Sequence, residues 1–417
     1  MHEQNELVEK LILIGVRTED TPDVEASLNE LAELVRTAGA ETVGYVIQSR
    51  ESVHPGTYIG KGKIDEVREL IRDSGATGVV ADDELSPAQM KNLEDGLDVK
   101  VLDRTILILD IFATRATTSE GKIQVELAQA RYSLTRLAGF GKSMSRLGGG
   151  IGTRGPGESK LETDRRRTRA RITQLKTELQ DVIRKRAVNR SLREKNHMPV
   201  AAIVGYTNAG KSTLLNRLTG ASVLSENKLF ATLDPTTRVL ALPSGQEVLL
   251  TDTVGFIRKL PHHLIEAFRS TLEEAKYADV IIHVADVSNP DFGKQMDTVY
   301  ATLHDLNAEG KPVITLFNKC DALPPEDGDS PLLFLRDPRA SKSIRISALT
   351  GEGLPDFLKA LEAEINGAFI YLEKVFEFTD AGKIQRIRKY GQLLEETYRE
   401  DGIFVRAYVP RELAGTD

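Results

Sequence analysis

The feature that most constrains the fold is a glycine-rich stretch at residues 205–213, GYTNAGKST, which matches the pattern G-x-x-x-x-G-K-[ST] in full. The apolar run at 199–204 predicts a short buried strand before it, and residues 213–218 predict a helix after it, closed by Gly220. A strand, a loop and a helix in this order form a phosphate cradle, because backbone amides and the positive end of the helix dipole face the anion. The stretch therefore predicts a nucleotide-binding domain of the α/β class.

Each residue of the loop is predicted to contact the nucleotide: Gly205, Tyr206, Thr207, Asn208, Ala209, Gly210, Lys211 and Ser212. Gly205 and Gly210 carry no side chain that would hold the chain away from the phosphates. Lys211 is expected to reach the β- and γ-phosphates, and the Ser212 hydroxyl is expected to ligate Mg²⁺. The alternative is a glycine-rich turn that matches by chance, which the position between a strand and a helix disfavours.

A threonine-rich loop follows the cradle at residues 229–238. A switch loop in this position supplies a hydroxyl to Mg²⁺ when a γ-phosphate is present, and Thr232, Thr236 and Thr237 compete for this role. Without the cradle upstream, an ordinary polar loop would be the better interpretation. The residues alone leave the choice of threonine open.

A D-x-x-G pattern follows the strand predicted at 247–251 and consists of Asp252, Thr253, Val254 and Gly255. A carboxylate at a strand end can hold Mg²⁺ through water, and the Gly255 amide can sense the γ-phosphate. The next residue, Phe256, cannot hydrogen-bond an attacking water. We therefore expect slow intrinsic hydrolysis that a partner, a cation or a rearranged switch loop accelerates, and no catalytic residue is assigned.

Two further loops are predicted to recognise the base, namely Asn318, Lys319, Cys320 and Asp321 after the strand at 313–317, and Ser347, Ala348 and Leu349. The Asp321 carboxylate can accept hydrogen bonds from guanine N1–H and the 2-amino group, donors that adenine lacks there. The Lys319 stem is expected to pack on the base, and Asn318 is expected to tie its loop to the cradle. The pattern favours GTP over ATP.

The length of 417 residues predicts roughly two to four domains. The expected organisation is an α/β domain at 1–115, a helical hairpin with a glycine-rich tip loop at 116–197, the P-loop domain at 198–367 and a small α/β domain at 368–417. In the first region strand-like and helical runs alternate, which predicts a parallel sheet. Ser86, Pro87 and Gln89 there have the spacing of a capped helix start. In the last region we expect a strand, a helix through Ile384 and Leu393, and a second strand.

Composition bears on the compartment. No apolar run approaches the length needed to cross a bilayer, and residues 1–6 lack the basic and apolar regions of a signal peptide. The single cysteine, Cys320, excludes an internal disulfide and fits a reducing compartment. A cytoplasmic location is therefore expected.

Basic residues gather on the second helix of the hairpin, although the formal net charge is -7. This segregation fits a phosphate backbone, and the predicted RNA contacts are Arg154 in the tip loop and Arg165, Arg166, Arg167 and Arg169 on the helix. The alternative is a solvated helix face, because acidic residues interleave at pairing distance. The basic loop at 55–63 is equally consistent with an anion site and with a flexible connection.

Together these motifs resemble the HflX family of translation-factor-related GTPases over nearly the whole chain. The resemblance is carried by the motifs above, by residues 230–234 and by residues 148–167 with their GTRGPGE core. It implies that Ser212 and Thr232 ligate Mg²⁺, that Phe230, Ala231, Thr232, Leu233 and Asp234 line the nucleotide site, and that Phe256 is the family's apolar replacement for glutamine.

The resemblance also implies a function. It indicates a GTPase that binds the large ribosomal subunit and its RNA, dissociates stalled or idle ribosomes, and has a possible secondary ATPase activity. Two alternatives stay open, a signalling switch that acts on protein partners and a nucleotide-dependent RNA-remodelling protein. In the first case the basic hairpin would be a coiled interaction arm.

Overall fold

The computed structural model describes residues 8–19, 21–144, 156–195, 198–220, 229–259, 274–323 and 335–410. The chain divides into two compact units. Unit 1 comprises Met1–Gln180, Lys228–Phe230 and Arg258–Phe268, and unit 2 comprises Asp181–Asn227, Ala231–Ile257 and Arg269–Asp417. Two short pieces of the central region thus belong to the N-terminal unit, which the sequence patterns do not indicate.

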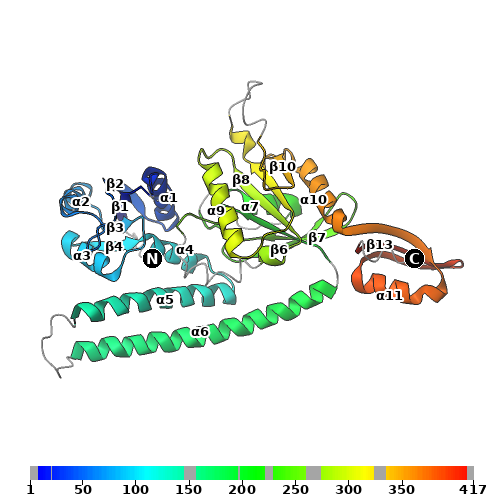
Figure 1. Cartoon of the computed structure of the whole chain (residues 1–417), viewed down its shortest axis with the longest axis horizontal. Helices are drawn as coiled ribbons and strands as arrows, with labels where there is room; N and C mark the ends of the chain where they lie inside the picture. The colour runs from blue at the N-terminus through cyan, green and yellow to red at the C-terminus, as the bar shows by residue number, and fades with distance from the viewer. Residues whose placement is uncertain are drawn as a thin grey trace, which may run out of the picture. The chain divides into compact units, whose positions relative to one another are not determined.

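Unit 1 contains a four-stranded parallel sheet in the order β2-β1-β3-β4 (Figure 1). Its strands are β1 (Lys10–Arg17), β2 (Glu41–Ser49), β3 (Gly78–Ala81) and β4 (Lys100–Asp103). Its helices are α1 (Val24–Thr37), α2 (Lys61–Ser74), α3 (Pro87–Leu97) and α4 (Arg104–Arg115). The parallel sheet predicted from the alternation of strands and helices is confirmed.

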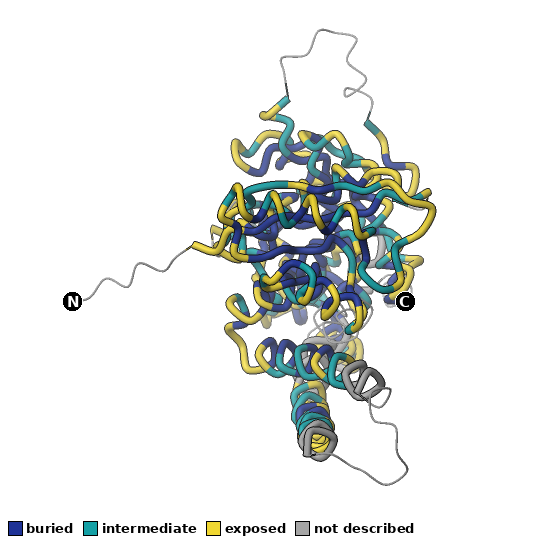
Figure 2. The backbone as a smooth tube through the Cα atoms, turned by 90° about the vertical axis from the view of Figure 1, so that its left-hand side faces the viewer, coloured by how far each residue is buried: buried dark blue, intermediate teal, exposed yellow. Residues whose placement is uncertain are grey.

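Alternate residues of β1 serve the two faces of this sheet, as the two-residue period of a strand requires. Ile12 belongs to the apolar cluster that contains Val67 of α2 and Leu93 of α3. Gly15 faces α1, since a Cβ on it would lie 2.7 Å from Val24 Cγ2. Buried residues accordingly run along the strands (Figure 2). A sheet covered on both faces leaves only its edges and strand ends for function.

Two long helices follow, α5 (Ser119–Met144) and α6 (Pro156–Lys195), and they lie side by side (Figure 1). Leu127 of α5 packs with Ile172 and Leu175 of α6 in a small apolar cluster. The predicted helical hairpin is therefore confirmed for the described residues, and its tip loop lies outside them.

Unit 2 contains a six-stranded sheet in the order β10-β9-β8-β5-β7-β6. Its strands are β5 (Val200–Gly205), β6 (Thr236–Ala241), β7 (Glu247–Asp252), β8 (Val280–Asp286), β9 (Val313–Asn318) and β10 (Lys342–Arg345). Strand β6 is antiparallel to β7, and the other neighbours are parallel. The helices α7 (Lys211–Thr219), α9 (Phe292–Asp305) and α10 (Leu354–Ala368) accompany this sheet. The carboxyl ends of the parallel strands therefore share one edge, where the predicted motifs meet.

The chain ends in a three-stranded antiparallel sheet in the order β11-β13-β12. Its elements are β11 (Phe369–Phe376), α11 (Ala381–Tyr390), β12 (Gln392–Arg399) and β13 (Gly402–Pro410). The predicted helix through Leu393 is wrong, because α11 ends at Tyr390 and Leu393 pairs with Ala407 in the sheet. Pairing with β13 outweighs the helix propensity of the Leu-Leu-Glu-Glu run in β12.

Candidate nucleotide-binding site

The phosphate cradle connects β5 to α7 at the centre of the unit 2 sheet. At Gly210 the backbone has φ of +96°, and a Cβ would lie 2.3 Å from Asn318 Nδ2. At Gly205 a Cβ would lie 2.3 Å from the Val284 carbonyl oxygen. Both glycines are therefore required by close approach of neighbouring strands, in addition to any need of a ligand.

Lys211 begins α7 and is only 6 % exposed. Its ammonium donates to the Tyr206 carbonyl oxygen at 2.7 Å, so the side chain closes over the loop. Burial lowers the pKa of Lys211 to about 8, and the charge of Asp252 opposes this shift. A buried lysine of this kind gains from an anionic ligand, because the anion stabilises its charged form.

Three oxygen-bearing side chains converge beside Lys211. Ser212 Oγ lies 2.7 Å from Thr232 Oγ1 and donates to Asp252 Oδ2 at 2.7 Å. They come from the first turn of α7, from the loop before β6 and from the carboxyl end of β7. Of the competing threonines, Thr237 instead contacts Thr251 Oγ1 at 3.0 Å. The structure therefore brings Thr232 to Ser212, as the resemblance implies.

The set of donors fits a hard divalent cation. Asp252 is fully buried, and its Oδ1 has no hydrogen-bond partner. Burial raises the pKa of Asp252, while Lys211 and the hydrogen bond from Ser212 act to lower it. A buried carboxylate oxygen beside two hydroxyl oxygens is the chemistry that Mg²⁺ prefers, and the cation would satisfy the unpaired oxygen.

Other residues predicted to line the site in the 230–234 segment differ in exposure. The side chains of Phe230 and Leu233 are 3 % and 2 % exposed and face the protein interior. Ala231 and Asp234 are half-buried. Thr232 meets the Ser212 hydroxyl with its side chain, whereas a contribution of Phe230 or Leu233 to binding would come from the backbone.

The segment after Asp252 continues along the cradle. The Phe256 amide donates to the Gly205 carbonyl oxygen at 3.1 Å, and the Thr207 amide donates to the Phe256 carbonyl oxygen at 2.7 Å. Gly255 lies so close that a Cβ would be 2.9 Å from Lys211 Nζ. The buried Thr253 hydroxyl donates to the Ile203 carbonyl oxygen, and Val254 is buried as well. The D-x-x-G segment is thus in direct contact with the phosphate loop.

The two loops that the sequence predicts to recognise the base are joined by Asn318, which is 2 % exposed. Its Nδ2 donates to the Ala209 carbonyl oxygen at 2.8 Å, and its Oδ1 accepts from the Ala348 amide at 2.9 Å. Asn318 thus ties its loop to the cradle, as the sequence predicts. Asp321 is exposed, and Leu349 is 71 % exposed despite its apolar side chain.

Lys319 has a partner that the sequence analysis missed. Its backbone has φ of +67°, and its ammonium lies 2.7 Å from Asp286 Oδ2 at the end of β8. This ion pair fixes the direction of the lysine stem beside Asp321. A carboxylate at the end of a buried strand is the signal that could have identified Asp286. Cys320 donates from Sγ to the Phe317 carbonyl oxygen, and Ser347 Oγ accepts from the Thr350 amide, so both have structural roles.

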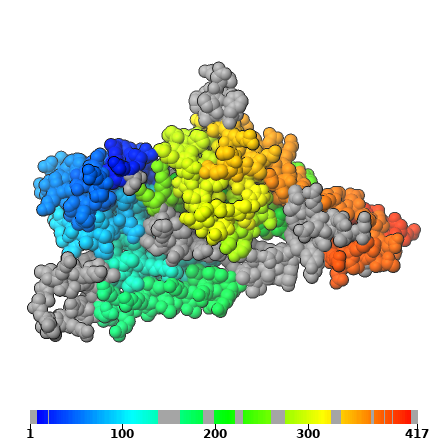
Figure 3. Space-filling model, in the orientation of Figure 1, coloured from blue at the N-terminus to red at the C-terminus, as the bar shows by residue number. Residues whose placement is uncertain are grey.

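The predicted RNA contacts on α6 fall into two groups. Arg165 is half-buried and donates to the Leu137 carbonyl oxygen at 2.9 Å, which joins α6 to α5. Arg166, Arg167 and Arg169 are exposed, and Figure 3 shows the stretch of α6 beside α5 at the surface of the molecule. Arg154 lies outside the described residues.

A bidentate pair also joins the two hairpin helices. Arg171 donates to both carboxylate oxygens of Glu126, at 2.6 and 2.7 Å. Arg165 contacts Leu137, and Arg171, further along α6, contacts Glu126, which is earlier in α5. The helices are therefore antiparallel. Local pairs expected for a solvated face are present too, since Arg184 lies 3.4 Å from Asp181.

The glycine-rich loop at 55–63 is held by its own contacts. His54 Nδ1 accepts from the amides of Gly56 and Thr57 at 3.2 and 3.1 Å, and the Gly60 amide donates to Gln48 Oε1 at 2.8 Å. Lys63 pairs with Glu66. These contacts argue against a loose connection.

Among the described residues, no helix combines the length and apolar character needed to cross a bilayer.

Comparison with known proteins gives matches over most of the chain. Three family profiles match it: "GTP-binding GTPase N-terminal" at residues 25–113, "GTP-binding GTPase Middle Region" at 115–193 and "50S ribosome-binding GTPase" at 200–319. A protein named GTPase HflX from Lacrimispora saccharolytica is 62 % identical over 411 residues, which cover 99 % of this chain and 96 % of the relative. The GTPase HflX of Escherichia coli is 42 % identical over 367 residues, 88 % of this chain and 85 % of the relative.

A more distant likeness is found among solved structures. The GTP-binding protein of the archaeon Sulfolobus solfataricus in complex with GDP is 24 % identical, with a TM-score of 0.46. The match covers 86 % of this chain and 99 % of that protein.

Proposed function

Because the chain belongs to the HflX family of GTPases, we propose that it binds the large ribosomal subunit and dissociates or rescues stalled or idle ribosomes in a GTP-dependent way. The chain hydrolyses GTP to GDP and phosphate, as its family does. The proposed partner also implies a cytoplasmic location.

In the proposed nucleotide site, Lys211 neutralises the β- and γ-phosphates and Asp321 accepts hydrogen bonds from guanine. Ser212 and Thr232 would hold Mg²⁺ directly, and Asp252 would hold it through water. When bound, the ion supplies charge stabilisation to the phosphates. This assignment is supported by the contacts of Ser212 with Thr232 and Asp252, both at 2.7 Å.

Hydrolysis by the protein alone is expected to be slow. Phe256 is 2 % exposed and carries no polar group, so it cannot orient a water molecule. The Gly255 amide is the proposed sensor of the γ-phosphate, because it belongs to the segment that contacts the cradle. A group supplied from outside, or by a rearranged switch segment, must complete the site.

The proposed partner is supported by the exposed arginines of α6. Arg166, Arg167 and Arg169 are exposed while Arg165 and Arg171 hold the hairpin together, so the exposed guanidinium groups are available to an RNA backbone. This is the observation that carries the ribosome proposal, together with the description of the profile that matches residues 200–319. We retain the boundaries 1–115, 116–197, 198–367 and 368–417 as proposed functional regions.

The test is GTP hydrolysis by the purified full-length protein, alone and with large ribosomal subunits, repeated with ATP. We expect strong stimulation of GTP turnover by the subunit and little stimulation of ATP turnover. The triple variant Arg166→Ala, Arg167→Ala, Arg169→Ala should lose subunit binding and the stimulation but keep basal turnover. A matched triple variant, Lys342→Ala, Lys359→Ala, Lys383→Ala, removes exposed charges from unit 2 and should behave as wild type.

Three results would contradict this function. Unchanged stimulation of the arginine variant by the subunit would indicate that these arginines form only a solvated helix face. No stimulation of wild-type protein that binds GTP normally would favour a switch acting on protein partners. Equal stimulation of ATP turnover would favour nucleotide-dependent RNA remodelling. A sucrose-gradient assay of ribosome dissociation then tests whether GTP binding alone, or hydrolysis, separates the subunits.

A further inference from the structure

The assignment of the chain changes from one unit to the other next to both segments that are expected to respond to the nucleotide, those with Thr232 and Gly255. Ala231–Ile257, which contains Thr232 and Gly255, belongs to unit 2. The two flanking stretches, Lys228–Phe230 (the first attachment) and Arg258–Phe268 (the second attachment), belong to unit 1. Any movement of Thr232 or Gly255 on nucleotide exchange must therefore be absorbed within a few residues of an attachment to unit 1.

Lys259, in the second attachment, contacts two carboxylates of unit 1, Asp82 and Asp83, and this pair of carboxylates is called the switch-point crevice. In the order β2-β1-β3-β4, the chain leaves β1 toward β2 on one side and continues to β3 on the other, so β1 and β3 flank the topological switch point. Ligands of open α/β sheets bind at the carboxyl ends of the strands at such a point. Here Asp82 and Asp83 follow β3 directly.

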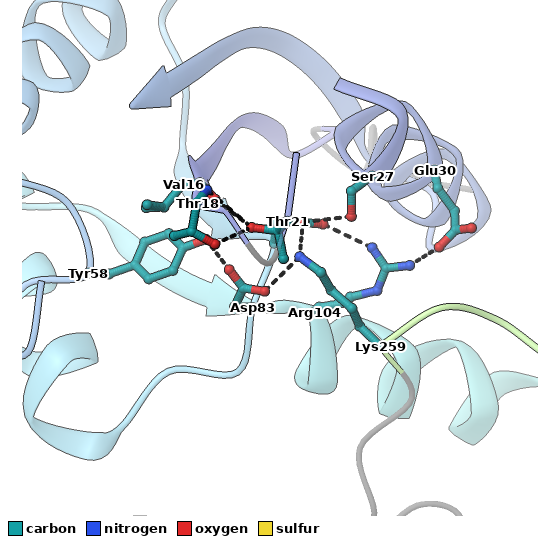
Figure 4. A network of polar contacts seen from close by, with 10 residues as sticks. Val16, Thr18, Thr21, Ser27, Glu30, Tyr58, Asp83, Arg104 and Lys259 are labelled. Atoms are coloured by element: carbon teal, nitrogen blue, oxygen red, sulfur yellow. Dashed lines mark hydrogen bonds and ion pairs between the residues drawn. The ribbon is translucent and has the colours of Figure 1, made fainter. Parts of the chain in front are cut away.

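Both carboxylates are held in place by side chains of unit 1 (Figure 4). Asp82 is fully buried and accepts from Ser27 Oγ at 2.7 Å and from Arg104 Nη1 at 2.9 Å. Asp83 accepts from the buried Tyr58 hydroxyl at 2.6 Å. Tyr58 lies within the glycine-rich loop at 55–63 and also pairs with His54 in an isolated antiparallel bridge.

The ammonium group of Lys259 points toward these carboxylates, as Figure 4 shows for Asp83. Lys259 Nζ lies 2.5 Å from Asp82 Oδ2 and 2.6 Å from Asp83 Oδ1. The residue has φ of +52°, a left-handed conformation that a non-glycine residue adopts at a cost and keeps only where its surroundings hold it. Burial raises the pKa of Asp82, and the charge of Lys259 opposes that shift. The ammonium therefore stabilises the ionised crevice.

The first attachment is apolar and independent of the second. Phe230 is 3 % exposed and has φ of +54°. Its ring meets the ring of Phe112 on α4 edge to face, with centroids 4.7 Å apart and planes at 81°. Aromatic pairs prefer this geometry. Contacts within unit 1 thus hold Phe230, two residues before Thr232, and Lys259, four residues after Gly255.

We propose that the switch-point crevice of unit 1 is an ammonium-binding site whose ligand is Lys259, and that this capture restrains the segment that senses the γ-phosphate. The proposal rests on the nucleotide site described above. While Lys259 is captured, Phe256 is paired through its backbone with Gly205 and Thr207 of the cradle. A γ-phosphate that engages the Gly255 amide has to compete with this arrangement. Release of Lys259 favours GTP, and capture favours GDP.

The test compares nucleotide affinities of full-length variants by competition between GDP and a non-hydrolysable GTP analogue. Lys259→Met and Asp83→Asn should each raise affinity for the GTP analogue relative to GDP by roughly threefold to tenfold, the range expected for a partly buried ion pair. The double variant should show the same change as Lys259→Met alone, because Lys259→Met already removes the contacts of the ammonium with both Asp82 and Asp83. Lys100→Met is the matched control, since Lys100 of unit 1 pairs with Glu9 away from the crevice.

A second measurement reads the crevice directly. Amide hydrogen exchange at residues 78–85 should be faster with the GTP analogue than with GDP in the wild type, and this difference should vanish in Lys259→Met. Additive effects of Lys259→Met and Asp83→Asn, or an unchanged affinity ratio with no nucleotide-dependent exchange, would overturn the proposal. A failure of the nucleotide site itself looks different, because Ser212→Ala would then leave affinity for the GTP analogue unchanged.

Discussion

The two parallel sheets of this protein use the same edge for opposite electrostatic tasks. In unit 2 the loops at the carboxyl ends of β5 and β7 bring together backbone amides and the buried Lys211, an environment for an anion. In unit 1 the corresponding edge presents Asp82 and Asp83 and holds the ammonium of Lys259. A shared architecture therefore does not determine the ligand, which depends on the charges that the loops supply.

The comparison also shows how each sheet selects a conformation of its loops. Unit 2 relies on glycines at positions where a side chain would meet another strand, as at Gly210. Unit 1 relies on buried polar side chains, since Arg104 contacts both Asp82 and Glu30. A glycine-based loop can close around a ligand of fixed shape, whereas a charged network responds to the gain or loss of one ion.

The largest expected effect separates the roles of the carboxylates at the two edges. Asp321→Asn replaces an acceptor by a group that also donates, so preference for GTP over XTP should fall on the order of a thousandfold, since a lost match leaves polar groups unpaired. Competition hydrolysis assays with both nucleotides measure this. Asp83→Asn in unit 1 is the control and should leave base preference unchanged. Equal GTP preference in wild type and Asp321→Asn would contradict the assignment of guanine recognition.

A smaller effect is expected from glycines at the two edges. Gly210→Ala should weaken GDP binding on the order of a hundredfold, because its left-handed backbone costs about 1–3 kcal/mol with a side chain and Asn318 must move. Gly62→Ala in the first turn of α2 meets no atom within 4 Å and should stabilise unit 1 by about 0.4–1 kcal/mol.

Titration calorimetry and thermal unfolding measure the two consequences separately. If Gly62→Ala weakened GDP binding as much as Gly210→Ala does, close approach to Asn318 would not be the reason for the glycine in the cradle.

Sequence reasoning succeeded where one local pattern determines the structure. The start of α3 is confirmed. The Ser86 hydroxyl accepts from the Gln89 amide, and the Gln89 side-chain oxygen accepts from the Ser86 amide, so both contacts form within a single turn. The cradle, the D-x-x-G segment and Asn318 were also identified, since each follows a buried strand in a fixed order. The oxygen donors of Ser212 and Asp252 could be predicted for the same reason.

The remaining features depend on contacts between distant parts of the chain. Nothing local to Lys259 reveals that its partners are Asp82 and Asp83 of the N-terminal sheet. Asp286 was missed because its role depends on Lys319, which lies in the loop after the neighbouring strand β9. The prediction extends the helix to Leu393, at the start of strand β12, because the pairing of β12 with β13 cannot be seen in its composition. Tertiary partners decide such elements, and single-sequence patterns do not contain them.

The protonation of Lys211 gives a third prediction. Burial lowers the pKa of this lysine, whereas burial raises the pKa of Asp82 in unit 1. Its pKa of about 8 means that the cradle loses its positive charge as pH rises through 8. GTP affinity should therefore fall roughly tenfold between pH 7 and pH 9, if binding requires the charged form. Fluorescent-nucleotide titrations across this range measure the effect, and a Lys211→Met variant should show weak, pH-independent binding.

The same group predicts a change in stability of known sign. Because the folded pKa lies below the ordinary value of 10.5, the unfolded chain binds more protons between about pH 8 and 10.5, so folding stability from this group rises with pH in that window. The difference in unfolding free energy between wild type and Lys211→Met should follow this rise in the nucleotide-free protein. A flat difference would mean that Lys211 stays charged when the cradle is empty.

The smallest expected effect concerns an ion pair of unit 1 outside the crevice. Arg171 and Glu126 join α5 to α6 in a bidentate pair, but their side chains are 40 % and 46 % exposed. Solvent screening limits such a pair to about 0–1 kcal/mol, so Arg171→Leu should lower the thermal stability of the hairpin slightly and leave the GTP to GDP affinity ratio unchanged. Differential scanning calorimetry and nucleotide competition test both statements. A shift in that ratio as large as the one expected for Lys259→Met would show that the charges of unit 1 act on the nucleotide collectively, rather than through the captured ammonium.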